Sequence, residues 1–210
     1  MKIGILGSGN VAQSLGTGLV QQGHEVKLGT RDAEKLNEWL TKTGSKASVG
    51  SFADAAKFGE AVFICTLGIG TENAITMAGK NHFSGKIVVD VTNPLDFSEM
   101  PPKMSVQYPD SMSQRIQRII PDAKIVKAFN TVSAPVMTNP KQLGEADLFV
   151  AGNDEAKQFV KEIAKKWGWH DVIDLGDMKA TYWIEALGML VITYGIKYND
   201  WNFALRFLRK

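Results

Sequence analysis

Residues 2–12 read Lys2-Ile-Gly-Ile-Leu-Gly-Ser-Gly-Asn-Val-Ala12, and this short stretch decides the fold. Residues 2–6 form an apolar run that is typical of a buried strand. Residues 7–12 fit the pattern G-x-G-x-x-A and lead into residues 10–22, where apolar side chains recur at helical spacing. The six-residue pattern alone is common. Between a strand and a helix, however, it indicates a dinucleotide-binding turn.

The chemistry of this turn follows from its residue types. Gly7 permits a tight turn, Gly9 lets the backbone approach a pyrophosphate, and Ala12 keeps the helix close to the sheet. Free N–H groups at the start of the helix attract the anion, and the helix dipole adds to that attraction. We therefore predict a dinucleotide site rather than an ordinary tight turn. The predicted contacts are Gly7, Ser8, Gly9, Asn10 and Val11.

The end of the second predicted strand indicates which dinucleotide binds. NAD sites place an acidic residue there, about 20 residues after the glycine turn, to bind the adenosine ribose. Here the strand is followed by Gly29-Thr30-Arg31, and Lys35 lies one helical turn further on. Thr30, Arg31 and Lys35 can together bind a 2′-phosphate, while Asp32 is expected to cap the next helix. The alternative is that Arg31 and Lys35 are solvated surface charges. We favour NADP(H).

The rest of the chain continues this alternation of short apolar runs and helical patterns. Near-continuous Val, Ile and Leu suits strands that are buried on both faces. We therefore expect an α/β Rossmann fold with a doubly wound, mainly parallel sheet, additional C-terminal strands and a helical tail. The predicted strands are residues 2–6, 25–28, 47–49, 61–66, 87–91, 125–129, 148–151 and 172–174. The predicted helices are residues 10–22 ended by Gly23, one capped by Asp32 and ended by Gly44, one opened by a Ser111–Gln114 capping box and closed by Pro121, and residues 155–167.

Two further strand ends lie where the nicotinamide half of the cofactor would meet the sheet. They are Thr66-Leu67-Gly68 and Thr92-Asn93. We predict contacts to the cofactor from Thr66, Leu67, Gly68 and Asn93. The two threonines are equally well interpreted as residues that cap loops.

Composition excludes several other classes of function. The net charge is only +2 and no basic run is interleaved with aromatic residues, so we expect no nucleic-acid partner. The single cysteine, Cys65, rules out a disulfide framework, and its apolar neighbours favour a small buried side chain over a reactive thiol. The three histidines are far apart in sequence, so we expect no metal site. No signal-peptide pattern precedes the first strand, and we expect a cytoplasmic protein.

The last third of the chain differs in character from the rest. We expect a single structural domain overall, made of an NADP-binding Rossmann domain, residues 1–178, and a helical tail, residues 179–210, packed on it or on a partner subunit. The stretch 182–196 is apolar nearly all round, but it is shorter than the roughly 20 residues that cross a bilayer. We therefore expect no membrane insertion and interpret it as a core or interface helix, which makes a homodimer through the aromatic tail possible.

With these residues in view, the sequence resembles the coenzyme F-420 (deazaflavin)-dependent NADP oxidoreductase family. It is also similar to the cytosolic reductase domain of the six-transmembrane epithelial antigen of prostate (STEAP) metalloreductases. The resemblance covers nearly the whole chain. Its most specific part is Lys127-Ala-Phe-Asn-Thr-Val-Ser133. The other matching residues are 7–11, 29–31 with Lys35, Val126, Ala134, Leu175-Gly176 and Ile184-Glu185.

This resemblance implies where hydride transfer takes place. In such enzymes the loop after the sixth strand borders the nicotinamide, so Asn130, Thr131, Val132 and Ala134 are expected to face it. A flavin-like acceptor would stack over the nicotinamide there. Hydride transfer between two rings needs alignment and exclusion of water, not a side-chain acid or base. Archaeal deazaflavin enzymes typically carry a histidine where Asn130 stands and metalloreductase-type domains an asparagine, so coenzyme F-420, FAD and FMN all stay candidate acceptors.

The expected function is thus an NADP(H)-dependent oxidoreductase that passes hydride between NADPH and a small flavin or deazaflavin-like acceptor. One alternative is a non-enzymatic NADP(H)-binding redox sensor whose helical tail binds a partner. Another is an imine or 2-hydroxy-acid type dehydrogenase. We rank that last because such enzymes need a larger helical second domain than residues 179–210 supply.

Overall fold

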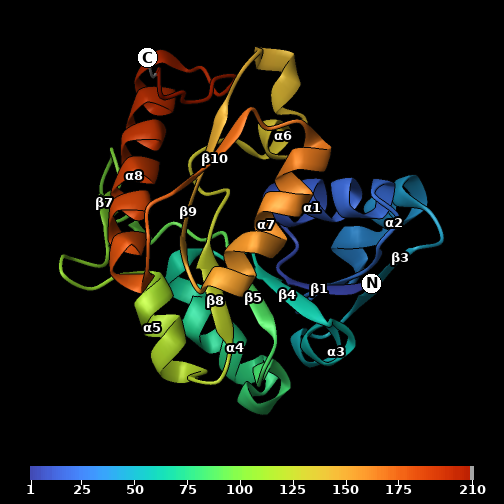
Figure 1. Cartoon of the computed structure of the whole chain (residues 1–210). Coiled ribbons are helices and arrows are strands. Elements are labelled where there is room, and N and C mark those ends of the chain that lie inside the picture. The colour runs from blue at the N-terminus through green and yellow to red at the C-terminus, as the bar shows by residue number, and fades with distance from the viewer. Residues whose placement is uncertain (209–210) are drawn as a thin grey trace.

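The computed structural model describes residues 1–208, and in this part of the chain eight strands form one sheet (Figure 1). The strand order is β10-β9-β8-β5-β4-β1-β2-β3, and every neighbouring pair is parallel except β8 and β9. The mainly parallel Rossmann sheet is therefore confirmed, and all eight predicted strands belong to it. Their bounds are β1 Lys2–Leu6, β2 Glu25–Gly29, β3 Ala47–Gly50, β4 Ala61–Ile64, β5 Ile87–Asp90, β8 Lys124–Lys127, β9 Asp147–Gly152 and β10 Asp171–Asp174.

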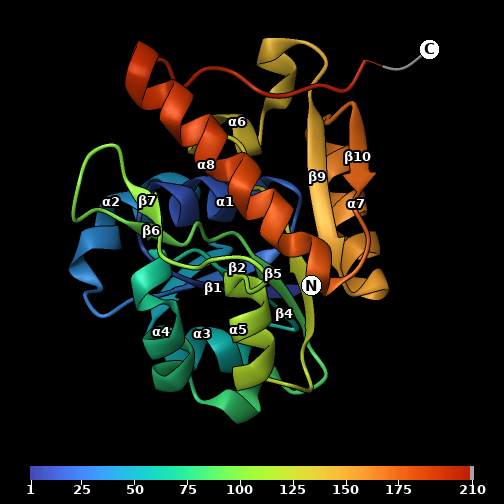
Figure 2. The same cartoon turned by 90° about the vertical axis from the view of Figure 1, so that its left-hand side faces the viewer.

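Helices cover both faces of the sheet, as Figure 2 shows most clearly. One face is covered by α1, α2, α6 and α7, and apolar side chains such as Leu15, Leu19 and Val160 pack there against the strands. The opposite face is covered by α3, α4 and α5 through residues such as Ile75 and Ile116. The bounds of these helices are α1 Asn10–Gln21, α2 Asn37–Thr43, α3 Phe52–Phe58, α4 Thr71–Ala78, α5 Met112–Ile119, α6 Ala134–Met137 and α7 Asp154–Trp167.

Short elements complete the connections. A two-stranded antiparallel ribbon, which the sequence patterns did not predict, pairs β6 with β7 in the long connection between β5 and α5. The ribbon and the 3₁₀ turns are β6 Leu95–Asp96, β7 Lys103–Met104, η1 Glu34–Leu36, η2 Gly68–Gly70, η3 Lys80–Phe83, η4 Pro140–Leu143 and η5 Met178–Ala180.

Two expected helix caps turn out differently. The Asp32 cap is wrong: the turn after β2 is η1, which begins after Ala33 without a side-chain cap, and Asp32 instead forms an ion pair with Lys35. The cap at Ser111 is confirmed in part. Its hydroxyl accepts the N–H of Gln114 at 3.1 Å, but the Gln114 side-chain oxygen is buried without a partner, so the reciprocal half of the capping box is not formed.

The last helix, α8 (Thr181–Tyr198), packs across β9 and α5 rather than within a closed core. One side of it is buried through Ile184, Glu185 and Val191. The other side leaves large apolar residues exposed, so only half of this apolar helix is covered within the described chain. These exposed residues are Trp183, Leu190, Tyr194, Ile196 and Tyr198.

After α8 the chain returns along β9, where the N–H of Asp147 donates to the carbonyl of Leu205 at 2.9 Å. The division at residues 178 and 179 stays a prediction. The last two residues of that predicted tail, 209–210, lie outside the described residues.

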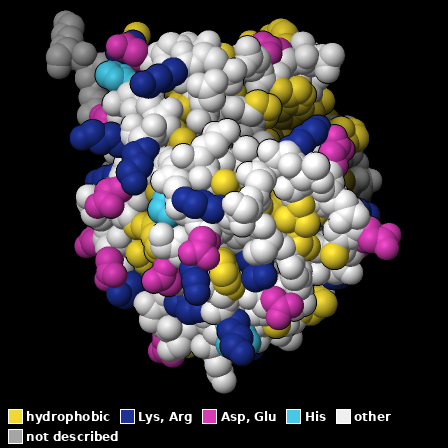
Figure 3. All heavy atoms as spheres, turned by 90° about the vertical axis from the view of Figure 1, so that its right-hand side faces the viewer, with side chains coloured by type: hydrophobic (Ala, Val, Ile, Leu, Met, Phe, Trp, Pro, Cys, Tyr) yellow, Lys and Arg dark blue, Asp and Glu magenta, His cyan; other side chains and the backbone are white. Residues whose placement is uncertain are grey.

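The surface carries mixed charge. On the face in Figure 3, which includes the side with the N-terminal helices in Figure 1, basic and acidic side chains are interspersed. Among residues 1–208, no helix combines the length and the apolar character needed to cross a lipid bilayer.

Candidate functional site

A cleft of about 680 Å³ lies at the carboxyl ends of the central parallel strands. Because the strand order is β8-β5-β4-β1-β2, the loops that follow these strands form a row along this edge. The turn after β2 lies at one end, the glycine turn after β1 comes next, and the loops after β4 and β5 follow. Twelve of the predicted cofactor contacts line the cleft: Gly7, Ser8, Gly9, Asn10, Val11, Thr30, Arg31, Lys35, Thr66, Leu67, Gly68 and Asn93.

The glycine turn has the geometry that a diphosphate needs. Gly7 has φ of +140°, which other residues rarely adopt, and its N–H donates to the carbonyl of Gly29 at 2.9 Å. Helix α1 begins after Gly9 with no side-chain cap, so the N–H groups of its first turn are free to bind an anion. A Cβ built on Gly9 would meet nothing within 4 Å. The backbone is therefore open on the side where a pyrophosphate would approach, and these residues fit a dinucleotide.

The turn after β2 is organised around Asp32. The Thr30 hydroxyl accepts the N–H of Asp32 and donates to its carbonyl, both at 3.1 Å. The ammonium of Lys35 lies 3.4 Å from the Asp32 carboxylate. Arg31 is exposed at the cleft and has no hydrogen-bond or ion-pair partner among the described residues. Of the three predicted phosphate donors, only Arg31 is therefore free.

The loop after β4 is held by its own hydroxyls. Thr66 shares a hydrogen bond of 2.9 Å with Thr71, and Thr71 also donates to the carbonyl of Leu67 at 3.2 Å. A Cβ on Gly68 would lie 2.6 Å from the carbonyl oxygen of Asn93, so this loop packs closely on the loop after β5. Thr66 is thus engaged in the loop, and its predicted contact with a cofactor stays a prediction.

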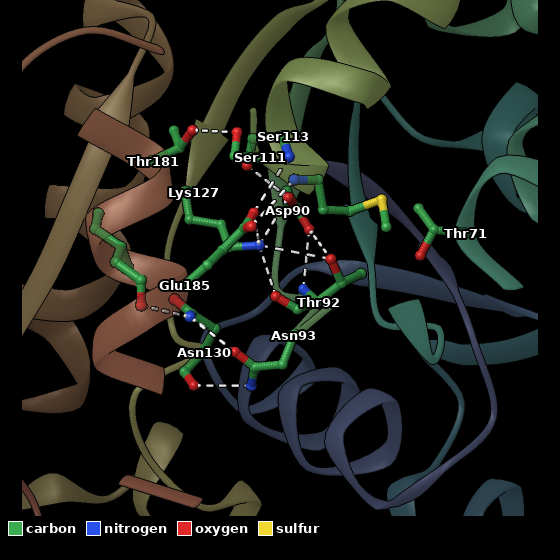
Figure 4. Close-up of polar contacts among 12 residues, drawn as sticks. Thr71, Asp90, Thr92, Asn93, Ser111, Ser113, Lys127, Asn130, Thr181 and Glu185 are labelled. Carbon is green, nitrogen blue, oxygen red and sulfur yellow. Dashed lines mark hydrogen bonds and ion pairs between the residues drawn. The ribbon is translucent and has the colours of Figure 1, made fainter. Parts of the chain in front are cut away.

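At the far end of the cleft, Asn93 and Asn130 bind one another reciprocally (Figure 4). The Asn93 amide donates to the backbone carbonyl of Asn130, and the Asn130 amide donates to the Asn93 side chain, each at 3.0 Å. Asn130 also donates to the carbonyl of Ile184 on α8 at 3.0 Å. Helix α8 comes so close here that a Cβ on Gly188 would collide with both asparagine side chains. Asn93 lines the cleft, and Asn130 supports it from behind.

The remaining residues of the predicted hydride-transfer loop do not border the cleft. Thr131 and Val132 are buried, and Ala134 is half-buried at the first turn of α6. Like Asn130, they lie outside the set of residues that line the cleft. Their contact with nicotinamide stays a prediction.

A buried ionic cluster lies directly behind this end of the cleft, and Figure 4 shows its members converging from three elements. The ammonium of Lys127, the last residue of β8, lies 2.9 Å from Asp90 and 3.0 Å from Glu185. It also donates to the carbonyl of Thr92 at 2.6 Å. All three charged side chains are completely buried. The Lys127 ammonium thus lies at the end of β8, where Asp90 and Glu185 enclose it.

Each carboxylate of the cluster is also bound by the ends of neighbouring elements. Asp90 accepts the Thr92 hydroxyl at 2.7 Å and the Ser113 hydroxyl at 2.6 Å. Glu185 accepts the N–H groups of Met112 and Ser113, which begin α5, at 3.1 and 3.3 Å. The cluster therefore ties α8 to the first turn of α5 and to the loop that carries Asn93.

The protonation of the cluster reflects its burial. Burial lowers the pKa of Lys127, but the charges of Asp90 and Glu185 outweigh this effect, so the pKa of Lys127 lies above its ordinary value. Burial raises the pKa of Glu185, against the opposing pull of Lys127. The two carboxylates therefore favour the charged form of Lys127, and its charge offsets theirs inside the protein.

The sequence contains a signal for this cluster in the charged residues of its apolar segments. Glu185 is the one charged residue in the apolar stretch 182–196, and Lys127 lies in an apolar strand run. Asp90 lies in another such run, 87–91. Opposite charges in separate apolar segments predict that the segments meet, since unpaired buried charges are costly. What the sequence does not contain is which segments are neighbours.

No acid–base or metal constellation accompanies the cleft within residues 1–208. No group of three or more His, Cys, Asp and Glu side chains there is placed to hold a metal ion. Cys65 borders the cleft, and burial raises the pKa of its thiol far above the ordinary value. Beyond the turn at residues 30–35, this thiol is the only ionisable side chain among the described residues that line the cleft.

Comparison with known proteins yields one consistent set of relatives. Residues 2–94 match the family model described as NADP oxidoreductase, coenzyme F420-dependent. The F420-dependent NADP reductase of Methanocaldococcus jannaschii is 30% identical over 98% of this chain and 97% of its own. A solved structure from Arthrobacter sp. FB24, named as an F420-dependent NADP-reductase, is 38% identical with a TM-score of 0.94 and covers 100% of both chains.

Two further likenesses are narrower. The metalloreductase STEAP3 of Rattus norvegicus is 29% identical over 91% of this chain, but the match spans only 37% of the metalloreductase. The Streptomyces aurantiacus imine reductase structure is 15% identical with a TM-score of 0.68, over 94% of this chain and 64% of its own, which shows a shared fold alone.

Proposed function

Since the chain belongs to the family of coenzyme F420-dependent NADP oxidoreductases, we propose that it is an NADP(H)-dependent reductase with a flavin-type or deazaflavin acceptor. The observation that carries this proposal is the row of loops along the carboxyl edge of the sheet. It begins with the turn at residues 30–35, where Arg31 and Lys35 line the cleft, continues through the open glycine turn, and ends at the Asn93–Asn130 pair. These are the parts that a 2′-phosphate, a diphosphate and a nicotinamide require, in the order that an extended dinucleotide presents them.

At the adenosine end of the cofactor, the proposed role of the chain is to bind the 2′-phosphate and the diphosphate. Arg31 offers a guanidinium fork to the 2′-phosphate, and Lys35 offers a second cation. The first turn of α1 binds the diphosphate through its free N–H groups, and Gly9 leaves room for it. Selectivity for NADP(H) over NAD(H) would therefore come from the turn after β2, because the diphosphate is common to both.

At the other end, the proposed work is orientation and exclusion of water. When bound, NADPH supplies a hydride, which an oxidised flavin or deazaflavin takes up together with a proton from solvent, leaving NADP⁺. The loops after β4 and β5 would hold the nicotinamide face. The reciprocal asparagine pair fixes the position of Asn93, and α8 supports that pair from behind. No ionisable side chain is needed at this end, because aligning two rings is the main requirement.

The names of the relatives indicate which acceptor to test first. The relatives from M. jannaschii and Arthrobacter sp. are named for F420, while the metalloreductase match covers a minor part of that protein. We therefore propose coenzyme F420 as the first acceptor to test, with FAD and FMN beside it.

The decisive experiment combines binding with turnover. NADPH and NADH are titrated calorimetrically, and NADPH oxidation is then followed with F420, FMN, FAD or FAD plus a ferric chelate. We expect NADPH to bind at least tenfold more tightly than NADH, a difference of about 1.4 kcal/mol, and one acceptor to accelerate oxidation. Equal affinity for the two nucleotides, or no acceleration with any acceptor, would contradict the proposal.

We also propose that the partner of α8 is a second copy of the chain. Trp183, Leu190 and Tyr198 are exposed on one side of this helix, and Tyr108 packs beside Trp183 with ring centroids 5.5 Å apart. Contiguous apolar surface of this kind is typical of interaction sites. Sedimentation of the wild type and of Leu190→Glu tests this: a dimer is expected for the first and a monomer for the second.

Other aspects of the setting are proposals as well. The net charge of +2 and the mixed charge in Figure 3 support a small-molecule substrate rather than a nucleic acid. We retain the cytoplasm as the proposed location, and fractionation of cells that express the tagged chain tests it.

A further inference from the structure

The turn after β2 contains one residue that works against the phosphate site around it. Arg31, Asp32 and Lys35 all line the same end of the cleft. Thr30, Arg31 and Lys35, the predicted 2′-phosphate donors, are called the clamp below. Asp32 binds two of them: Thr30 through its backbone at 3.1 Å, and Lys35 through its carboxylate at 3.4 Å. Asp32 does not cap η1, and the interaction that the structure gives its carboxylate is the ion pair with Lys35.

We propose that Asp32 is a specificity-determining residue that limits the preference of this cleft for NADP(H) over NAD(H). This inference rests on the proposed function, since it assumes that Arg31 and Lys35 bind the 2′-phosphate. Asp32 competes with that phosphate for the Lys35 ammonium, and its negative charge repels the phosphate. The same carboxylate is a suitable acceptor for the free ribose hydroxyls of NAD(H).

The charges of the residues that line this end of the cleft support the inference about Asp32. Arg31 and Lys35 contribute two positive charges and Asp32 removes one. The side chains of Lys35 and Asp32 are 70% and 47% exposed, so their ion pair is solvated and exchangeable. Lys35 can therefore leave Asp32 for a phosphate, but each binding event must break that pair. Removing the Asp32 charge abolishes both the competition and the repulsion.

The expected size of the effect follows from Coulomb's law. A single charge about 5 Å from a phosphate dianion in solvent at moderate salt changes affinity by about fivefold. Asp32→Asn keeps the size of the side chain and removes its charge. We expect this variant to bind NADP⁺ about fivefold more tightly than the wild type, with no gain for NAD⁺.

The chain offers a matched control at Glu34. This residue is also acidic and exposed and lies two positions away in η1, but it does not line the cleft. Glu34→Gln changes the net charge by the same amount. If the effect of Asp32 were only a matter of total charge, both variants would gain equally. We expect Glu34→Gln to bind NADP⁺ and NAD⁺ like the wild type.

The experiment is calorimetric titration of the full chain and four variants, Asp32→Asn, Glu34→Gln, Arg31→Ala and Lys35→Ala, with NADP⁺, NAD⁺ and 2′,5′-ADP. Thermal unfolding of each variant verifies that it is folded. A gain for NADP⁺ and 2′,5′-ADP confined to Asp32→Asn supports the inference. The gain should also disappear at high salt, because exposed charges are screened.

The outcomes separate the inference from the function on which it rests. If Arg31→Ala and Lys35→Ala leave NADP⁺ affinity unchanged, the clamp itself is wrong and the proposed cofactor preference fails with it. If these two variants lose affinity while Asp32→Asn gains none, only the inference about Asp32 is overturned. It is also overturned if Asp32→Asn binds NADP⁺ more weakly, since Asp32 would then be holding Lys35 in its binding position.

Discussion

Lys127 and Lys35 each lie next to a carboxylate, but their surroundings give the two ion pairs opposite properties. Lys127 is 0% exposed between Asp90 and Glu185, with ion-pair distances of 2.9 and 3.0 Å. The Lys35 side chain is 70% exposed beside Asp32, at 3.4 Å. Water competes for the second pair and is excluded from the first.

The effect of an ion pair on stability therefore depends on whether solvent reaches it. Inside the protein, removing either partner leaves a charge without solvent, so the buried cluster acts as a fixed joint between β8, β5, α5 and α8. At the surface, the partners separate at little cost, which is compatible with the proposed movement of Lys35 from Asp32 to a 2′-phosphate. Ion pairs thus hold elements together behind the cleft, whereas the exposed Lys35–Asp32 pair at the end of the cleft can break and re-form.

The largest expected effect is the difference in stability between removing Lys127 and removing Lys35. Lys127→Met should lower the free energy of unfolding by about 3–5 kcal/mol, because two carboxylates are left buried without a cation. Lys35→Met should change it by less than about 0.5 kcal/mol. Urea denaturation of both variants provides the measurement. Similar midpoints for the two would remove the distinction drawn here.

A smaller effect is expected at the glycine turn, between the two regions. Gly9→Ala places a methyl group where nothing lies within 4 Å, so the fold should be unaffected. That methyl group occupies the approach of the diphosphate, and we expect NADP⁺ affinity to fall about tenfold. Calorimetry and thermal unfolding are measured on the same sample. A variant that binds NADP⁺ normally would show that the diphosphate lies elsewhere.

Salt should distinguish the two regions more gently. Raising the NaCl concentration from about 0.05 to about 0.5 M screens exposed charges, and we expect the preference for NADP⁺ over NAD⁺ to shrink about threefold. The buried cluster should not respond, because it is shielded from ions. NADP⁺ and NAD⁺ titrations at the two salt concentrations measure this. An unchanged preference would argue that the 2′-phosphate is bound away from solvent.

The smallest expected effect is a pH dependence at Glu185. Burial raises the pKa of this carboxyl in the folded protein, so the unfolded chain releases the proton first as the pH rises. The contribution of Glu185 to stability is therefore complete below its unfolded pKa and is lost as the pH rises through the folded one. Glu185→Gln lacks this loss. The free energy of unfolding of the wild type minus that of Glu185→Gln should therefore be smaller at pH 7 than at pH 4. Urea denaturation of both proteins at the two pH values tests the sign.

The fold was largely predictable because its signals are local. Each strand is an apolar run and each long helix an apolar repeat, so all eight strands of the sheet could be located from residues close together in sequence. The ribbon β6–β7 was missed because two-residue strands contain no periodicity. The antiparallel pairing of β8 with β9 was not predictable either, because the direction of a strand depends on the path of the chain between strands and not on the residues of one short segment.

The candidate site was predictable to the extent that it follows from the order of motifs. Twelve predicted residues line one cleft, because the glycine turn and the strand ends meet at one edge of a parallel sheet. The role of Asp32 was misjudged as a helix cap, since an Asp before a helix is a frequent cap and its ion pair depends on side-chain geometry. The buried cluster joins residues 90, 127 and 185 and depends on packing between distant segments.

Helix α8 has different neighbours on its two sides, and Gly188 lies on the inner one. One side of the helix faces outward with large apolar residues, and the other side touches the asparagine pair at a point where no Cβ fits. Only one helix diameter, about 10 Å, separates these sides. A second subunit that docked on the outer side, as proposed above, would therefore contact the same helix that supports the Asn93–Asn130 pair. The proposed dimer contact and the proposed nicotinamide end of the cleft would then be coupled through α8.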